Sequence, residues 1–350
     1  MIDYNLSKKI LTVGATAKPL GGISQVIANY NNHVFTTMQR VEYNSGKKGL
    51  INLLSFVVAF FKEFWLLMVK PSIKIVHIHT AAGFSFVRVS FYWALAKCFR
   101  RSTIMHIHAG AFADYYRKHP RFVGFVLKRC TRVFALSSQW RDFFENEVKL
   151  NNVVVLNNVI EPPVTIKTDP SPQLHFLFLG HMVPNKGIFD LLDVVAENAH
   201  QLKDRFVLHI GGALNEDKVK SIIVDRHLEE FVTFEGWVME QRKVELLNRC
   251  DVYILPSYIE GVPISILEAM SYGMPIISTT VGGIPSIVKD GVNGSLFTPG
   301  DKVAMAAAIM SYVDSRDLVS EQGKHSIELS KPYLPDAVAM SLEMLYKSIL

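Results

Sequence analysis

Residues 251–300 read DVYILPSYIEGVPISILEAMSYGMPIISTTVGGIPSIVKDGVNGSLFTPG. The apolar run from Val252 to Leu255 stops at a proline and a serine, which predicts a buried strand that ends in a turn. Pro263 fits the first turn of a helix, and the apolar spacing after it predicts a helix that ends at Gly273. A second strand is expected from Pro275 to Thr280.

Two carboxylates belong to this strand, loop and helix. Glu260 precedes the helix, and Glu268 lies in its second turn. Between them we expect backbone N–H groups without partners, at Val262, Ile264 and Ser265, and the positive end of the helix dipole. Phosphates occupy such sites, and a bound diphosphate would leave one carboxylate near each sugar that flanks it. The stretch therefore predicts a nucleotide-sugar site.

The spacing E-x7-E and the segments EGVPISILEAMSYGMPII and GGIPSIVKDGVNGSLF resemble the retaining glycosyltransferases of family 4, also called glycosyltransferase group 1. The resemblance implies an α/β fold of the GT-B type, with two Rossmann-like parallel-sheet domains facing a central cleft. It also implies that Glu260 contacts the transferred sugar and Glu268 the ribose. The alternative for Glu268 is an ordinary exposed helix position. Further donor contacts are expected from Gly261, Val262, Pro263 and Ile264.

Length agrees with two domains, because 350 residues exceed one core of typical size. We expect an acceptor-side domain over residues 1–165 and a nucleotide-sugar-binding domain over residues 166–332. Residues 157–173 are rich in Pro, Asn and Thr, which is typical of a linker. The resemblance implies that a last helix, residues 333–350, crosses back to the first domain.

Charge is distributed unevenly along the chain. Residues 1–165 hold 21 Lys and Arg against 8 Asp and Glu, a net charge of +13, whereas the remainder has 16 against 24, a net charge of −8. Such a basic half attracts lipid headgroups, phosphates or nucleic acid. No recognition helix, RNA-binding strand signature or zinc knuckle is recognisable, so no nucleic-acid partner is predicted.

Three widely spaced cysteines, Cys98, Cys130 and Cys250, indicate a reducing compartment, and we expect them to be small buried hydrophobes. The N-terminus, MIDYNLSKKILTVG, has no apolar signal core. The expected location is cytoplasmic, with peripheral attachment to the inner face of the membrane as an extension of that expectation.

Residues 50–69 are the most apolar run in the chain, and they are nearly long enough for a membrane span. Lys62 and Glu63 fall inside the run, and such charges cost about 2.5–3.5 kcal/mol each at a bilayer centre. We therefore favour a core-facing helix over a span. A partly exposed helix that docks on an anionic membrane is the alternative, because Phe61, Trp65 and several lysines lie together.

A strand over residues 9–13 leads into the loop GATAKPLGGISQVIANY. Strand, glycine loop and helix is an arrangement by which open α/β sheets approach phosphates. In the resembled family, a glycine pair at this place faces the donor diphosphate and the acceptor, which implies that role for Gly21 and Gly22.

Two further strands, residues 73–79 and 103–108, both end in HIH. The resemblance implies that His108 reaches the reacting sugar; a structural histidine at the sheet rim is the alternative. Two histidine pairs could hold a metal. No cysteine or carboxylate accompanies them, the chain has no D-x-D motif, and the resembled family works without metal, so no metal is predicted. We expect His77, His79 and His106 to be structural or peripheral.

The segment LHFLFLGHMVPNKGIFDLLDVV opens the second domain with a strand at 174–179 and a helix from about residue 188. The resembled family has G-R-L-x-x-x-K-G here. Lys186 matches its diphosphate-binding lysine, while His181 replaces the arginine and offers at most one charge and no bidentate fork. The resemblance also implies that Trp237 and Val238 lie beside the nucleotide base, with simple packing of Trp237 as the alternative.

The resemblance thus implies a glycosyltransferase that moves a sugar from a nucleotide-diphosphate sugar to an acceptor hydroxyl, with retention and without a cofactor. A glycan or lipid-linked acceptor and a role in polysaccharide or glycolipid biosynthesis are expected. The alternatives are a GT-B nucleotide-sugar epimerase and a non-catalytic protein that binds sugar nucleotides or glycans.

Overall fold

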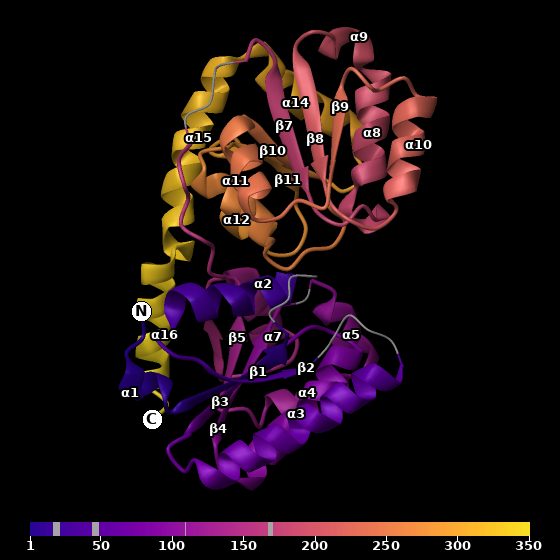
Figure 1. Cartoon of the computed structure of the whole chain (residues 1–350). Coiled ribbons are helices and arrows are strands. Elements are labelled where there is room, and N and C mark those ends of the chain that lie inside the picture. Colours follow the sequence, from indigo (N-terminus) through magenta and orange to yellow (C-terminus); the bar gives the residue numbers. More distant parts are fainter. Residues whose placement is uncertain (17–21, 44–48, 109, 167–170) are drawn as a thin grey trace. The chain divides into compact units, whose positions relative to one another are not determined.

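A computed structural model describes residues 1–16, 22–43, 49–108, 110–166 and 171–350. The chain forms two compact units (Figure 1). Unit 1 comprises Met1–Glu161 and Pro332–Leu350, and unit 2 comprises Pro162–Lys331. Each unit is built around one six-stranded parallel sheet, and the sequence predicts a parallel sheet in each, although not the number of strands.

The sheet of unit 1 has the strand order β2-β1-β3-β4-β5-β6. The chain moves from β1 to the edge strand β2 and then returns to the other side of β1, so the order reverses between β1 and β3. Ligands of open α/β sheets bind beyond the carboxyl ends of the strands at such a reversal. The strands are β1 (Ile10–Ala15), β2 (Gln39–Tyr43), β3 (Ile75–Thr80), β4 (Ser102–Ile107), β5 (Arg132–Ala135) and β6 (Val153–Val155).

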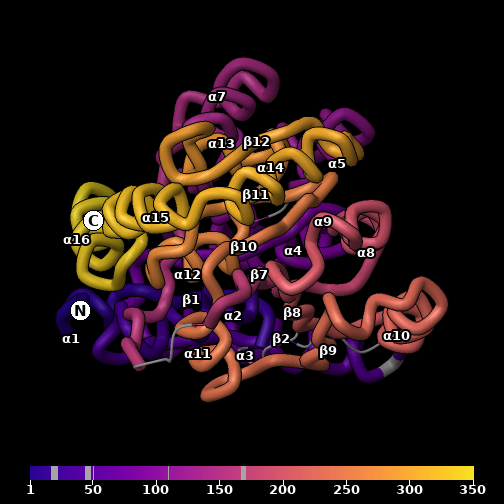
Figure 2. The backbone as a smooth tube through the Cα atoms, turned by 90° about the horizontal axis from the view of Figure 1, so that it is seen from above, coloured from indigo at the N-terminus to yellow at the C-terminus, as the bar shows by residue number. Residues whose placement is uncertain are grey.

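Side-chain alternation along these strands separates two faces. Val76 and Ile78 join the apolar core beneath α3 and α4, whereas His77 and His79 point to the opposite face, toward η1 and α16. The short α1 and α16 lie side by side (Figures 1 and 2), so both ends of the chain belong to this region. The helices are α1 (Tyr4–Ser7), α2 (Gly22–Asn29), η1 (Tyr30–Val34), α3 (Leu50–Val69), α4 (Phe84–Cys98), α5 (Phe112–Lys118), α6 (Pro120–Leu127), α7 (Ser138–Asn146) and α16 (Pro335–Lys347).

The sheet of unit 2 has the order β12-β11-β10-β7-β8-β9, with a reversal between β7 and β10. Helix α8 contacts both α10 and α14, and α11 and α12 cover β7 and β10 (Figure 1). The strands are β7 (Leu174–Leu179), β8 (Phe206–Gly211), β9 (Val232–Gly236), β10 (Val252–Leu255), β11 (Ile276–Thr279) and β12 (Gly294–Phe297). The helices are η2 (Pro184–Lys186), α8 (Ile188–Glu197), α9 (Ala199–Leu202), α10 (Glu216–Asp225), α11 (Glu240–Arg249), α12 (Ile264–Ser271), α13 (Ile284–Ile287), α14 (Lys302–Asp314) and α15 (Arg316–Ser330). The short helix η3 (Lys331–Tyr333) follows α15, where the chain passes from unit 2 back to unit 1.

Two expectations about burial are wrong. The helix predicted over residues 50–69 is present as α3, but most of its side chains are exposed to solvent rather than facing the core. Only a narrow stripe of it can reach the sheet, because α4 occupies the neighbouring space. Cys98 is also exposed, since it lies on the last turn of α4, whereas Cys130 and Cys250 are buried as expected.

Candidate functional site

The reversal between β7 and β10 brings the loops after these two strands together in unit 2. The β7 loop carries His181 and Lys186, and the β10 loop carries Ser257 and Glu260. A backbone hydrogen bond from Tyr258 N to Asn185 O, 2.9 Å long, joins the two loops. The sequence stretches that predicted the donor site therefore meet at the edge of the sheet where open α/β proteins bind ligands.

An ion pair lies at the centre of this edge. Lys186 Nζ is 2.5 Å from Glu260 Oε1, and Ser257 Oγ donates a hydrogen bond of 2.8 Å to the same oxygen. The Glu260 side chain is 8% exposed and that of Lys186 is 23% exposed, so the lysine keeps access to solvent while the carboxylate is held in place. A cation and an oriented carboxylate thus stand together, as a phosphate linked to a sugar would require.

Glycines allow the loops to approach so closely. Gly187 has φ +71°, and a Cβ there would lie 2.0 Å from the carbonyl oxygen of Pro256. Gly282 has φ +55°, and a Cβ there would lie 1.9 Å from the carbonyl oxygen of Glu260. Any side chain at either position would push a loop away from Glu260, so both glycines are required by the geometry of the site.

Helix α12 begins one residue later than the sequence suggests, with Pro263 as its N-cap. No side chain caps this N-terminus, so the amides of its first turn, which include Ile264 and Ser265, can serve an anion. Val262 precedes the helix and already makes an interaction within the protein. Its predicted role as an N–H donor to the ligand stays a prediction. Gly261 is also engaged, since its carbonyl accepts a hydrogen bond of 2.6 Å from Gly283 N.

The second carboxylate, Glu268, is buried on α12 rather than exposed. Lys243 Nζ of α11 lies 2.8 Å from Glu268 Oε1, and the two side chains are 18% and 8% exposed. The alternative of an ordinary exposed glutamate is wrong. Lys243 itself was not predicted, because nothing in the pattern of α11 distinguishes it from other helix lysines.

Aromatic rings gather beyond β7 and β9. The rings of His181 and Trp237 are nearly parallel, with an interplanar angle of 16° and centroids 5.8 Å apart. Trp237 is 42% exposed, so packing alone does not account for it. Val238 packs against β8, because a Cβ on Gly211 would come within 2.7 Å of Val238 Cγ2. A flat, partly exposed surface of this kind can stack on a nucleobase.

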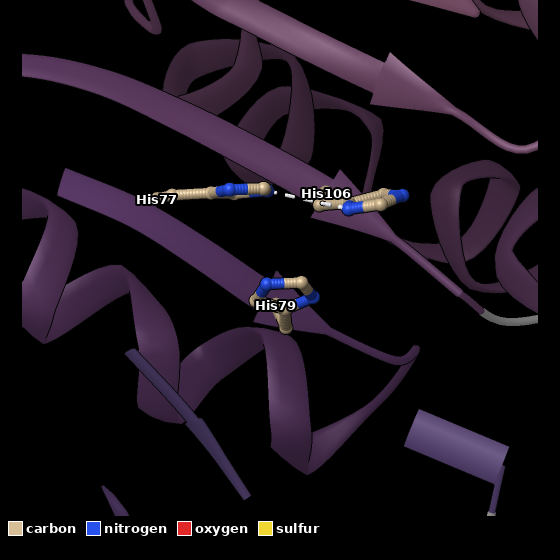
Figure 3. Close-up of side chains that lie close together, drawn as sticks. All are labelled: His77, His79 and His106. Carbon is tan, nitrogen blue, oxygen red and sulfur yellow. Dashed lines mark hydrogen bonds between the residues drawn. The ribbon is translucent and has the colours of Figure 1, made fainter. Parts of the chain in front are cut away.

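Unit 1 has a different polar centre, made of histidines on β3 and β4 (Figure 3). His77 Nε2 lies 3.3 Å from His106 Nδ1, and His79 Nδ1 lies 3.0 Å from His108 Nε2. Tyr346 of α16 completes the arrangement, with its hydroxyl 2.6 Å from His77 Nδ1. His77, His79 and His106 are thus buried and hydrogen-bonded within unit 1, and their structural role stays a prediction. No sequence signal pointed to Tyr346.

Burial keeps these imidazoles neutral. Desolvation lowers the pKa of His77 and of His108 to about 3 and that of His79 and His106 well below the ordinary value. His108 is the least buried of the four and lies directly after β4. A neutral imidazole there can exchange hydrogen bonds with a hydroxyl group without bringing a charge.

The histidines also offer nitrogen ligands within 4.8 Å of one another, at His77, His79 and His106. The His77 and His79 rings are stacked with centroids 4.4 Å apart, and the His77 and His106 rings are nearly parallel, with centroids 5.3 Å apart and a hydrogen bond between them (Figure 3). Metal ligands instead direct their nitrogens at one point. The described side chains therefore fit a hydrogen-bonded stack, and the expectation of no metal stays a prediction.

Gly21 lies outside the described residues. Gly22 is the first residue of α2 in unit 1. Their implied contact with a donor stays a prediction.

Doubly wound parallel sheets with charged residues at a strand-order reversal define the GT-B class of fold for this chain. Residues 166–328, nearly all of unit 2, match the model of the family Glycosyl transferases group 1. The second unit is thus similar to this family.

Relatives agree with this assignment. An uncharacterized glycosyltransferase of Methanocaldococcus jannaschii is 22% identical over 228 residues, which cover 65% of this chain and 62% of that protein. Lipopolysaccharide 1,6-galactosyltransferase of Escherichia coli is 30% identical over 170 residues, 45% of this chain and 46% of that protein. The chain thus spans less than two thirds of the curated relatives it matches here.

The fold extends over both units. The crystal structure of HepE from Anabaena in complex with UDP is similar, with a TM-score of 0.76 at 17% identity, and the match covers 97% of this chain and all of that one. A further structure of HepE contains UDP-glucose.

Proposed function

We propose that the protein is a glycosyltransferase that takes a sugar from a nucleotide-diphosphate sugar and transfers it to an acceptor hydroxyl, with retention and without a metal. The observation that carries the proposal is the pair of buried carboxylates, Glu260 and Glu268, each held by a lysine beside the uncapped N-terminus of α12. UDP and UDP-glucose bound to a structural neighbour support a donor of this kind.

Each residue has a distinct part in the proposed donor complex. Lys186 turns from Glu260 toward the diphosphate, which frees Glu260 to accept hydrogen bonds from hydroxyls of the transferred sugar. Glu268 accepts hydrogen bonds from the ribose hydroxyls. The rings of Trp237 and His181 provide the surface on which the base stacks.

In the transfer step, the bond between the anomeric carbon and the diphosphate oxygen breaks, and a bond from that carbon to the acceptor oxygen forms. The hydroxyl proton of the acceptor goes to the departing diphosphate, whose charge rises as it leaves. Lys186 and the first-turn amides of α12 stabilise that charge, and such electrostatic stabilisation is usually the largest contribution to catalysis. Because the lysine and the helix supply this stabilisation, the proposed step needs no metal.

We also propose a contact between His108 and a hydroxyl group of the sugar. As a neutral imidazole, it can hydrogen-bond the reacting sugar while its other contact, to His79, fixes the ring. We propose a glycan or lipid-linked acceptor in polysaccharide or glycolipid biosynthesis, because one relative is a lipopolysaccharide 1,6-galactosyltransferase. The proposed site of action is the cytoplasmic side of a membrane.

A screen of nucleotide-sugars for thermal stabilisation, followed by hydrolysis and transfer assays with the best one, tests the proposal. A transferase releases nucleoside diphosphate slowly with water and faster with an acceptor extract. Interconversion of two nucleotide-sugars without an acceptor would instead indicate an epimerase. A folded protein that no nucleotide-sugar stabilises would contradict the proposal.

A further inference from the structure

Helix α3 buries a charged residue and exposes apolar ones, the reverse of an ordinary surface helix. Its fully buried side chains are Ala59, Glu63 and Leu67, at 2%, 0% and 1% exposure among the described side chains of the helix. The spacing of four residues makes these three a single narrow stripe facing the sheet. The one acidic residue of the helix thus points inward, whereas surface helices normally place charges outward.

The outward face of α3 is apolar instead. Val58, Phe61 and Trp65 are 67%, 64% and 59% exposed. Further exposed apolar side chains on the same helix are Ile51, Leu53, Leu54, Val57, Phe64, Met68 and Val69. A continuous apolar surface of this size is rare on a monomer and marks a place where another apolar phase is contacted.

The apolar face continues over the two neighbouring helices of unit 1. The ring of Phe91 on α4, 54% exposed, lies 5.7 Å from that of Phe56 on α3. On α6, Phe125 is 50% exposed, and Arg129 lies 3.9 Å above its ring. We call the exposed side chains of α3, α4 and α6 the apolar face. Figure 1 shows α3 and α4 running along the same edge of unit 1.

The charge around the apolar face is almost entirely positive. Residues 50–130 contain twelve lysines and arginines and two acidic residues, Glu63 and Asp114, of which Glu63 is buried. Exposed positive side chains on or beside the three helices are Lys62, Lys97, Arg100, Lys128 and Arg129. An apolar surface bordered by cations is complementary to the surface of an anionic bilayer, in which acyl chains lie beneath negative headgroups.

A second copy of the chain is a poorer occupant, because pairing two apolar faces would bring these cations together. A membrane-spanning α3 also agrees less well with the structure than a helix that lies on the membrane. In the described part of the chain, α3 is the helix long and apolar enough to span, over Ile51–Val69 with a mean hydropathy of 1.7. However, Ala59, Glu63 and Leu67 belong to the sheet side of unit 1, and a span would expose Glu63 to lipid.

We propose that the apolar face is a docking surface for an anionic phospholipid bilayer, with α3 lying in the plane of the interface and its aromatic side chains inserted among the headgroups. The cations of α4 and α6 contact the anionic headgroups, and Glu63 stays within the protein. Docking goes beyond the proposed sugar transfer. It can be measured without any nucleotide, and donor binding can be measured without vesicles, so failure of one leaves the other standing.

Sedimentation of the full chain with vesicles tests the proposal. The vesicles are pure phosphatidylcholine or an equal mixture with phosphatidylglycerol, at low and high salt. The protein should bind the mixed vesicles at least tenfold more tightly, and salt should weaken but not abolish the binding, because the apolar insertion is not screened. Absence of binding to anionic vesicles at low salt would overturn the proposal.

Variants locate the surface. The pair Phe61→Ser and Trp65→Ser, made together, should reduce binding at least tenfold, whereas Val303→Ser with Leu214→Ser, at exposed apolar positions of unit 2, should not. Equal binding by all variants would overturn the proposal. So would a concentration-dependent dimer in sedimentation velocity that the Phe61 and Trp65 changes abolish, which would assign the face to a second copy.

A second measurement does not depend on how the variants fold. Brominated phospholipid in the vesicles should quench the fluorescence of the wild-type protein, and Trp65→Phe should remove most of that quenching, because Trp93 and Trp140 are buried and the exposed Trp237 belongs to unit 2 and not to the apolar face. Equal quenching with and without Trp65 would contradict insertion of α3.

Discussion

The two units share an architecture but differ in how their polar centres are built. In unit 2, two buried carboxylates are each paired with a lysine, beside an uncapped helix N-terminus. In unit 1, the corresponding edge of the sheet carries imidazoles that burial keeps neutral. The polar centre of unit 2 thus suits a highly charged ligand, whereas the polar centre of unit 1 offers uncharged hydrogen-bonding groups.

The carboxylate of unit 2 provides the largest expected effect. Glu260→Gln keeps the shape but removes the charge that pairs with Lys186, and we expect transfer to slow by about 10²–10³-fold, as when an oriented electrostatic partner is removed from other enzymes. Steady-state release of nucleoside diphosphate measures it. Asp193→Asn, which removes an ion-paired carboxylate on α8, is the matched control and should keep its rate. Equal losses of rate in both variants would show that Glu260 acts only in an ordinary structural ion pair.

The neutral imidazoles of unit 1 predict a steep loss of stability in acid. Because their folded pKa values are lowered, their contribution is complete above about pH 6.5 and falls as the pH drops toward about 3. Each imidazole that stays neutral in the folded state lowers the free energy of unfolding by about 1.4 kcal/mol for each unit by which the pH falls within this range. Hydrogen exchange at several pH values should show β3 and β4 losing protection first. If the strands of unit 2 lost protection at a higher pH than β3 and β4, the neutral imidazoles would not be the acid-sensitive part of the protein.

Glu63 should produce the opposite pH dependence in unit 1. Its carboxylate oxygens have no hydrogen-bond partner among the described residues, and burial raises its pKa well above the usual range. The raised pKa means that its favourable contribution is complete below about pH 4.5 and is lost as the pH rises through the folded value. We expect Glu63→Leu to stabilise the protein near neutral pH by about 1–3 kcal/mol, the cost of an unpaired buried polar group.

Urea unfolding at pH 5 and pH 8 checks this expectation, because the gain should be larger at pH 8. Leu67→Ala, on the same buried stripe, is the control that should destabilise at both pH values. A Glu63→Leu protein that is less stable at pH 8 would show that the carboxylate has a partner worth more than its burial costs.

Glu268 should affect donor binding more than chemistry. Since a ribose contact is the same in the ground state and the transition state, Glu268→Gln should raise KM for the donor by about tenfold and leave kcat nearly unchanged. Initial rates at varied donor concentration separate the two constants. A fall in kcat at constant KM would place Glu268 at the reacting sugar instead, and so exchange its role with that of Glu260.

The smallest effect is expected at His79, which positions His108. His79→Leu should lower kcat a few-fold, about 3- to 10-fold, because His108 loses one hydrogen bond that orients it. His79→Asn retains a polar atom near the same place and should recover part of the rate. If both variants behave alike, the hydrogen bond has no part in the reaction.

The sequence predicted the central edge of unit 2 well, because that information is local. The strand at 174–179 is β7 with the same bounds, and the stretch after β10 places Glu260 in the loop before α12, as expected. The partners of these residues could not be predicted, since Lys243 and Tyr346 are distant in the chain and only the folded structure brings them near.

Helix α3 and strand β2 show two other limits. Residues 50–69 are apolar around the whole helix, so no periodicity selects the buried face, and the charge that would normally mark the outer face, Glu63, lies inside. Strand β2, Gln39–Tyr43, was not anticipated, because an edge strand with three polar residues in five lacks the apolar run typical of a central strand.

Calorimetric titration with the nucleoside diphosphate of the donor that best stabilises the protein tests the central claim most directly. We predict that Lys186→Met weakens binding by about 10- to 100-fold, the loss of one charge-assisted contact, while Lys302→Met, which removes the lysine of an ion pair on α14, leaves the affinity unchanged. Equal affinity of the Lys186→Met protein and the wild type would contradict a diphosphate site between β7 and β10.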